Sequence, residues 1–207
     1  MTLTNSTISG NQAAGNFGGG LFAGNEATVT IESSTIVQNS SATNGGGVAA
    51  SVTSPTTFNN SIIVGNTGTG EAPDFFTSGT NFSGSYNLLG TGVALTSGSS
   101  NQTGQTFASA ALGSLADNGG PTQTHALLFD SPAIDAGNSA LSTDGRGLVR
   151  AVDFEFVDNA SGSNASDIGA FELQTTDPLS IPLVVVCLLY TSPSPRDRTR
   201  SRMPSSA

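Results

Sequence analysis

Apolar and polar residues recur in a fixed order along the first third of the chain. Residues 3–11 (LTNSTISGN) return as residues 31–39 (IESSTIVQN) and as residues 58–66 (FNNSIIVGN). Two apolar positions and one asparagine are kept in all three copies: Leu3, Ile31 and Phe58; Ile8, Ile36 and Ile63; Asn11, Asn39 and Asn66. Each set steps by 28 and then by 27 residues, which indicates a solenoid built from repeated coils.

The residue types in the repeats indicate strands rather than helices. The segments are short, rich in Thr, Ser, Val and Ile, and interrupted by Gly and Asn, whereas helical repeats need apolar residues three and four positions apart. The sequence therefore predicts an all-β fold, a right-handed parallel β-helix with about 27 residues per coil. The isoleucine set is expected to stack in the core at a spacing of ~4.8 Å, and the asparagine set to occupy the following turn.

A second block marks another corner of each coil. Residues 18–21 (GGGL) return 27 positions later as residues 45–48 (GGGV), and a corner of this kind needs positive φ or close contact between coils. A fourth copy begins at residues 87–90 (NLLG) and the repeat then ends, so the coils are assigned to residues 1–90. Residues 91–106, rich in Gly, Ser, Thr, Asn and Gln, are interpreted as a polar surface loop or an irregular coil.

The second half of the chain carries four further motifs: residues 117–127 (DNGGPTQTHAL), 131–137 (SPAIDAG), 144–147 (DGRG) and 167–172 (DIGAFE). Their order and spacing resemble the choice-of-anchor Q domain, a bacterial extracellular module, and the coils resemble the β-helix repeats of polymorphic outer-membrane proteins. The resemblance covers about residues 1–175. It implies a secreted or cell-surface location and carries no established catalytic residues.

Residues 107–176 are therefore expected to form an irregular C-terminal cap that folds over the open end of the β-helix. Within this cap the sequence predicts a short helical turn in residues 108–117 and a one-turn helix over residues 131–137, with a serine N-cap and a glycine at its end. Two short strands are expected around residues 148–156 and 168–173.

The last thirty residues differ in character from the rest. Residues 180–190 (SIPLVVVCLLY) are apolar over much less than the ~20 residues of a transmembrane helix, and residues 177–186 are interpreted as the start of an anchor. Residues 187–207 carry four arginines and the single cysteine; they resemble a translated sequencing adapter and are interpreted as a non-native tail. Because the repeat is already in progress at residue 3, further coils and a signal peptide are expected upstream of Met1.

The charge of the chain limits its classes of partner. There are 15 Asp and Glu residues against 6 Lys and Arg residues, and the formal net charge is −9. Such a surface repels phosphate backbones and anionic lipids, so we expect no nucleic-acid partner and no adsorption to acidic membranes. The expected partners are the cell envelope or an extracellular carbohydrate or protein.

Parallel β-helices include polysaccharide lyases and hydrolases, but these coils lack the side chains for that chemistry. A lyase needs a basic group and a hydrolase needs paired carboxylates. Between residues 3 and 89 the charged residues are Glu26, Glu32, Glu71 and Asp74. Glu71 and Asp74 are the one close pair and are interpreted as a solvated turn. The chain is therefore predicted not to be an enzyme.

Three other side chains are candidates for chemistry. His125, the single histidine, is interpreted as structural, bonded to a turn carbonyl or to Asp117, rather than as a base or a metal ligand. Arg146 and Arg150 are expected to clamp nearby carboxylates and so to fix the cap. The carboxylates close to them in sequence are Asp135, Asp144, Asp153 and Asp167.

Residues 153–167 (DFEFVDNASGSNASD) form an acidic loop that is the best candidate for a cofactor site. Its hard oxygen ligands are of the type that Ca²⁺ prefers: Asp153, Glu155, Asp158, Asn159 and Asp167. The spacing differs from an EF-hand because Ala160 stands where a ligand would be. A solvated acidic loop is the alternative.

Together these features favour a secreted or cell-surface β-helix protein with a structural, adhesin-like role. Two alternatives stay open at this point. The first is a polysaccharide lyase or hydrolase whose catalytic coils lie upstream of Met1. The second is a cytoplasmic β-solenoid for which Met1 is the true start.

Overall fold

The computed structural model describes residues 1–15, 17–79, 82–92, 94–155 and 157–177, and these residues form strands, turns and bends without a helix. The strands of the coils are β1 (Thr2–Thr4), β2 (Thr7–Ser9), β3 (Leu21–Ala23), β4 (Val29–Glu32), β5 (Thr35–Val37), β6 (Val48–Ala50), β7 (Thr56–Asn59), β8 (Ile62–Val64), β9 (Phe75–Thr77), β10 (Phe82–Ser83) and β11 (Leu88–Leu89). A separate hairpin follows, made of β12 (Leu112–Ala116) and β13 (Thr124–Leu127).

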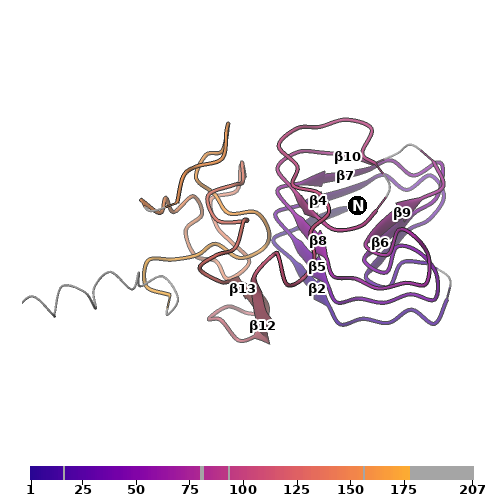
Figure 1. Ribbon diagram of the computed structural model, residues 1–207, viewed down its shortest axis with the longest axis horizontal. Helices are drawn as coiled ribbons and strands as arrows, with labels where there is room; N and C mark the ends of the chain where they lie inside the picture. The colour runs from indigo at the N-terminus through magenta and orange to yellow at the C-terminus, as the bar shows by residue number, and fades with distance from the viewer. Residues whose placement is uncertain (16, 80–81, 93, 156, 178–207) are drawn as a thin grey trace, which may run out of the picture.

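The coils stack into three parallel sheets (Figure 1), with strand orders β1-β4-β7-β10, β2-β5-β8-β11 and β3-β6-β9. The register pairs Ile8 with Ile36 and Ile36 with Ile63. The Leu3, Ile31 and Phe58 set pairs in the same way one sheet earlier. These pairings confirm the predicted ladders and the fold class: the chain is a parallel β-solenoid.

The interior of the solenoid is filled by the inward residues of the three sheets. Ile36 and Ile63 are fully buried, whereas Ile8 is only half-buried because it belongs to the first coil. Towards the last coil the core becomes aromatic, since the Phe58 and Phe82 rings pack 4.9 Å apart and Phe75 contacts both edge-on. Burial of each such side chain contributes roughly 1.5–3 kcal/mol.

The asparagine set forms a buried hydrogen-bond ladder. The backbone N–H of Asn11 donates to the side-chain oxygen of Asn39 (3.0 Å), and the N–H of Asn39 donates to Asn66 (2.9 Å). The ladder ends on Asp74, whose carboxylate accepts the N–H groups of Asn66 (2.8 Å) and Thr91 (2.7 Å). Asp74 is buried, so its interpretation as part of a solvated turn is wrong, and this burial raises its pKa.

The glycine blocks make the corner before the third sheet. Gly18 and Gly45 have positive φ (73° and 63°), as expected for that corner. A Cβ atom on Gly46 would lie 2.1 Å from the carbonyl oxygen of Thr67 on the next coil. Close stacking of coils therefore excludes a side chain at this corner.

Residues 94–106 form an irregular last coil, the second of the two interpretations of this polar stretch. Single bridges join Ser83 to Ser97 and Leu88 to Gln102. The spacing between equivalent residues is shorter here, 14 residues instead of 27. It is seen in the bond that the backbone N–H of Asn87 donates to the side chain of Asn101 (3.1 Å). This short polar coil covers the end of the solenoid core.

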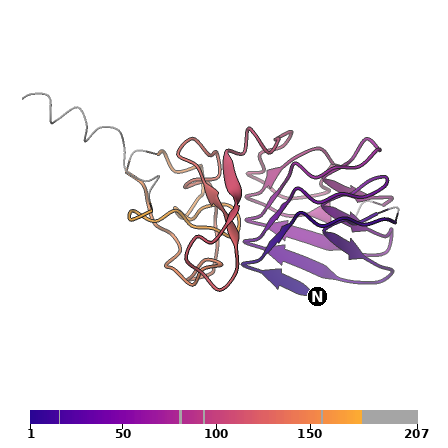
Figure 2. The same cartoon turned by 90° about the horizontal axis from the view of Figure 1, so that it is seen from below.

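Residues 107–177, here called the flanking module, lie beside the solenoid rather than over its end (Figures 1 and 2). The expectation of a cap over the open end is therefore wrong. The module packs on the outer face of the β2-β5-β8-β11 sheet, where Val37, Ile62 and Val64 point away from the solenoid core. Ile168 and Phe171 are among the module residues that join this second hydrophobic core.

The local elements expected inside the module are mostly absent. Residues 131–137 form a turn instead of a helix, and residues 107–110 form a turn before β12. Residues 148–156 and 168–173 form no strand within the described part of the chain. Their backbone N–H groups donate to carboxylates instead: Val152 to Glu172 (2.8 Å) and Leu173 to Asp167 (2.7 Å).

The expected anchor and the non-native tail, residues 177–186 and 187–207, lie outside the described residues except for Asp177. In the described part of the chain, no helix has the length and apolar character needed to cross a membrane.

Candidate functional site

One corner of the solenoid holds the flanking module. The corner residues Asn5, Ser33, Asn60, Tyr86 and Ser100 follow one another from coil to coil and all have left-handed backbone, with φ between 46° and 56°. The corner lies between the β1-β4-β7-β10 and β2-β5-β8-β11 sheets. A left-handed non-glycine residue is uncommon, so five at equivalent positions mark a corner fixed by other contacts.

Four of these corner residues bond to the module. The bonds run from the Asn5 amide to the Thr143 carbonyl (2.8 Å), between the Ser33 and Ser139 hydroxyls (2.8 Å), from the Asn60 amide to the Asp167 carbonyl (2.8 Å), and from the Tyr86 hydroxyl to the Gly162 carbonyl (2.9 Å). The module is thus bonded to four successive coils.

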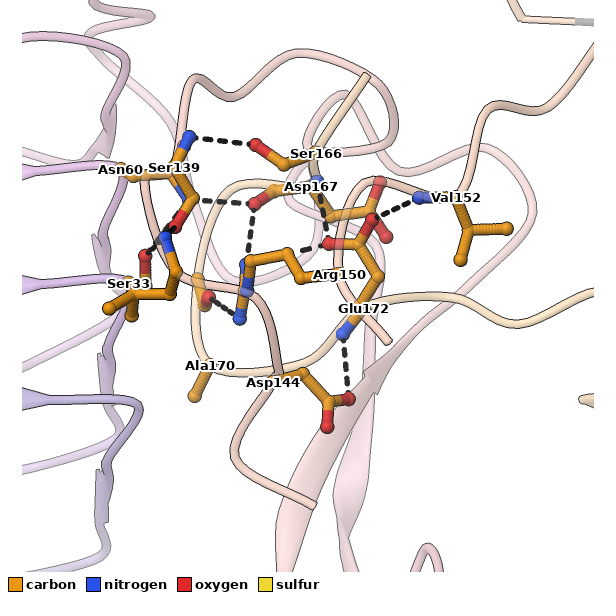
Figure 3. A network of polar contacts seen from close by, with 12 residues as sticks. Ser33, Asn60, Ser139, Asp144, Arg150, Val152, Ser166, Asp167, Ala170 and Glu172 are labelled. Atoms are coloured by element: carbon orange, nitrogen blue, oxygen red, sulfur yellow. Dashed lines mark hydrogen bonds and ion pairs between the residues drawn. The ribbon is translucent and has the colours of Figure 1, made fainter. Parts of the chain in front are cut away.

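Arg150 lies at the centre of a buried polar network beside this corner (Figure 3), and its side chain is fully buried. Its guanidinium donates to the carbonyl oxygens of Asp167 (3.1 Å) and Gly169 (3.0 Å) and pairs with Glu172 (3.5 Å). It also donates to the side chain of Asn5 (3.3 Å) on the first coil. The arginine therefore ties two segments of the module to the solenoid.

Arg146 makes the second ion pair, with the carboxylate of Asp144 (2.8 Å). Its guanidinium also donates to the Glu172 carbonyl, lies 3.7 Å from the centre of the Phe171 ring, and contacts Asp177 (3.3 Å). Both arginines thus clamp carboxylates, as the sequence predicts. Glu172 is the partner that sequence reasoning missed, although it stands inside the fourth motif.

The buried carboxylates of the network are saturated by backbone donors. Asp144 accepts the N–H groups of Arg146 (2.8 Å) and Glu172 (3.1 Å). Glu172 accepts from Val152 and from Asp167 (2.9 Å). Burial, and then the nearby charge of Glu172, raises the pKa of Asp167; burial also raises the pKa of Glu172, partly offset by Arg150. Such a network stabilises one arrangement of loops.

Asp135 differs from the other acids because half of its carboxylate lacks a partner. One oxygen accepts the N–H of Phe154 (3.1 Å), and the other has no hydrogen-bond partner among the described residues, although the side chain is fully buried. Burial and the charge of Asp153 raise the pKa of Asp135 to about 6. Asp135 is not a partner in the recorded arginine ion pairs of the described residues, and its carboxylate holds the module through a backbone N–H instead.

We expect the stability of the protein to depend on Asp135 and on pH. A carboxylate with pKa of about 6 in the folded state and 3.8 otherwise binds its proton more tightly when folded. The contribution of Asp135 to folding stability is therefore complete below pH ~4 and is lost as pH rises to ~6. This change amounts to about 3 kcal/mol. We expect urea unfolding to show that Asp135→Asn becomes more stable relative to the wild type as pH rises over this range. The measured quantity is the difference between their free energies of unfolding. A difference that is the same at every pH would contradict this assignment.

His125 has both ring nitrogens engaged. Nδ1 bonds to the Gly113 carbonyl (2.7 Å) in β12, and Nε2 bonds to the Ser9 hydroxyl (2.9 Å) on the first coil. Burial lowers the pKa of the imidazole, which favours its neutral form. The ring also packs edge-on against Phe107 (5.8 Å). These contacts suit a structural histidine; the carbonyl belongs to a strand rather than a turn, and the recorded bonds do not include Asp117.

Of the predicted calcium ligands, Asp153 and Asn159 lie together, since the Asn159 amide donates to the Asp153 carboxylate (3.3 Å), but the full set is not assembled. Asp153, Glu155, Asp158 and Asn159 are exposed, whereas Asp167 is buried in the network with both carboxylate oxygens accepting N–H groups. Among the described residues no group of three or more His, Cys, Asp or Glu side chains is placed to hold a metal ion. The geometry offers Ca²⁺ no site built from this loop and Asp167 together.

Comparison with known proteins gives no relative for this chain. No family model, no curated protein and no solved structure matches it. The fold defines this protein as a parallel β-solenoid with a laterally docked module. Its function has to be inferred from its own residues.

Proposed function

We propose that this chain is part of a secreted or cell-surface protein with a structural, adhesin-like role. In this role the solenoid presents a polar, nearly uncharged surface to the cell envelope or to an extracellular carbohydrate. The flanking module serves as a structural clamp along one side of the coils. Non-catalytic presentation of a surface is the function that these residues support best.

One observation carries this proposal: the solenoid has no side-chain pair suited to acid–base chemistry. Its charged residues up to residue 92 are four acids and no base. Asp74 is the buried one among the acids, and both its oxygens accept backbone N–H groups within the fold. Outward positions on the first sheet carry hydroxyl side chains that pair across coils, Thr30 with Thr57 and Thr57 with Ser83.

The location outside the cell rests on the sequence motifs. Three of the four motifs that resemble the choice-of-anchor Q domain supply members of the buried network: Asp135, Asp144, Arg146, Asp167 and Glu172. These motif residues therefore stabilise the fold of the module. The proposed surface location follows from the resemblance of residues 107–176 to that extracellular module.

The proposal is tested by binding and activity measured on the same sample. The purified chain is mixed with insoluble polysaccharides and with bacterial envelopes, and both the sedimented protein and the soluble reducing ends are quantified. We expect retention that persists at high salt, because a nearly uncharged surface does not rely on screened ionic contacts. We expect no release of sugar. Release of reducing ends or of unsaturated uronates would favour the lyase or hydrolase alternative, and failure to bind any of these materials would contradict the surface role.

A further inference from the structure

The sheet farthest from the flanking module carries aromatic residues on its outer face. Phe22 of β3, Ala49 of β6 and Phe76 of β9 are paired across the three coils. Their neighbours in each strand point inward to the solenoid core, so these three positions point outward. In Figure 1, β6 and β9 lie on the side of the solenoid away from the module, which leaves this face uncovered by residues 107–177.

A third ring completes the group. Phe17, which comes before the glycine corner, lies parallel to Phe76 with ring centres 5.6 Å apart and an angle of 5° between the planes. The two rings cover Ala49, which is buried although it points outward. Together with Phe22 they wall a pocket of about 260 Å³, edged by Ser51 and Ser78.

Exposing these aromatic rings to water costs free energy unless a ligand covers them. Phe22 is 56% exposed and Phe17 is 41% exposed. Outward positions on the first sheet are Thr30, Thr57 and Ser83 instead, so the solenoid does not need aromatic residues on its outer faces. Grouped exposed rings, unlike scattered ones, mark interaction sites.

The chemistry of the pocket selects an uncharged, ring-shaped ligand. No charged side chain lines it, so nothing there pairs with the carboxylate of an anionic uronate. Flat aromatic faces take up the apolar C–H face of a sugar ring, while hydroxyl groups such as those of Ser51 and Ser78 suit its polar edge. The volume lies below the ~300–1,000 Å³ of pockets for drug-sized ligands, which suits a single ring.

We propose that Phe17, Phe22 and Phe76 form a binding site for one neutral pyranose unit of a polysaccharide. This inference rests on the proposed function, and it names the residues and the ligand class of the carbohydrate contact. The site recognises an uncharged chain such as a glucan, mannan, galactan or xylan by stacking against its rings.

Affinity gel electrophoresis tests the site with these four soluble polysaccharides and with polygalacturonate as the charged comparison. At least one neutral polysaccharide should retard the wild-type chain, and polygalacturonate should not. Phe22→Ala should weaken that retardation about tenfold, since one stacking surface is lost, and Phe22→Tyr should keep it. Phe129→Ala is the matched control, because Phe129 lies in the flanking module and is 59% exposed. Thermal melting of each variant should match the wild type.

The outcomes separate this site from the wider proposal. If a neutral polysaccharide retards the wild type and both Phe22→Ala and Phe17→Ala bind as well as the wild type, the aromatic site is wrong while the surface role stands. If no neutral polysaccharide retards the chain but envelopes still retain it, the aromatic sugar site is wrong while the surface role stands. If neither material binds, both proposals fall.

Discussion

Replacing Arg150 with methionine is expected to destabilise the protein by about 3–5 kcal/mol, the range for breaking one side of a buried ion pair. The change leaves the carboxylate of Glu172 buried without its cation and removes donors from the carbonyl groups of Asp167 and Gly169. It also removes the bond to Asn5 on the first coil. Methionine keeps an unbranched apolar stem in place of that of arginine, so the loss reports mainly the polar contacts of the guanidinium.

The effect of Arg150→Met is measured by urea unfolding followed by circular dichroism, with Arg150→Lys as the comparison. Lysine keeps the charge but cannot span acceptors on two segments and on the solenoid, so it should restore only part of the stability. Asp158→Asn, at an exposed acid of the module, is the control and should change stability by less than ~0.5 kcal/mol. Equal stability of Arg150→Met and the control would show that the network does not hold the module.

The second large effect is expected at Asn39, the central residue of the asparagine ladder. Its side chain donates to the carbonyls of Ile8 (3.0 Å) and Val37 (3.1 Å) and accepts the N–H of Asn11 (3.0 Å). Asn39→Ala removes these bonds from a fully buried side-chain position, at about 1–3 kcal/mol for each group that is left without a partner. The Val37 carbonyl keeps the N–H of Gly10 (3.4 Å). We expect a total loss of about 3–5 kcal/mol, since the coils relax in part.

Asn11→Ala provides a matched control for Asn39→Ala. Asn11 occupies the same position one coil earlier and is exposed, so water replaces its bonds and the loss should stay below about 1 kcal/mol. Both variants are compared by the midpoint of urea unfolding and by amide exchange in β2 and β5. Similar small losses for the two variants would contradict the ladder as a source of stability.

The solenoid could be predicted from the sequence because stacking places equivalent residues on top of one another. A coil of fixed length repeats its core residue and its turn residue, so Ile8, Ile36 and Ile63 reveal both the period and the register. Asp74 was misjudged because it closes the asparagine ladder with a different side chain, which breaks the visible repeat.

The lateral position of the module was missed, although a signal for it is present. Residues 62–64 (IIV) are three consecutive buried apolar residues. A strand with one face in the core alternates apolar and polar residues, so a continuous apolar strand indicates that both faces are covered. Ile63 fills the solenoid core, while Ile62 and Val64 meet the module.

The interior of the module could not be predicted from local patterns. Its loops are fixed by carboxylates that accept backbone N–H groups across long stretches of sequence, as between Asp144 and Glu172 (3.1 Å). Such bonds replace the strand pairing that residues 148–156 and 168–173 suggest, and they leave no periodic trace. The two arginines were the one reliable sign, because a buried cation in an acidic segment requires carboxylate partners.

A disulfide cross-link tests the lateral docking most directly. Ser33 on the second coil and Ser139 in the module have hydroxyl groups 2.8 Å apart, so the side chains that Ser33→Cys and Ser139→Cys introduce start from neighbouring positions. The variants are made with Cys187→Ser, so that no other cysteine remains. The control pair combines Ser139→Cys with Ser100→Cys, three coils away from Ser33 and thus ~14 Å along the stack, beyond disulfide reach.

Oxidation followed by gel electrophoresis without reductant should show nearly complete cross-linking of the 33/139 pair and none of the 100/139 pair. We expect this result because the module runs along the side of the coils (Figure 2). Cross-linking of the 100/139 pair without the 33/139 pair would place the module over the end of the solenoid and would contradict the docking described above.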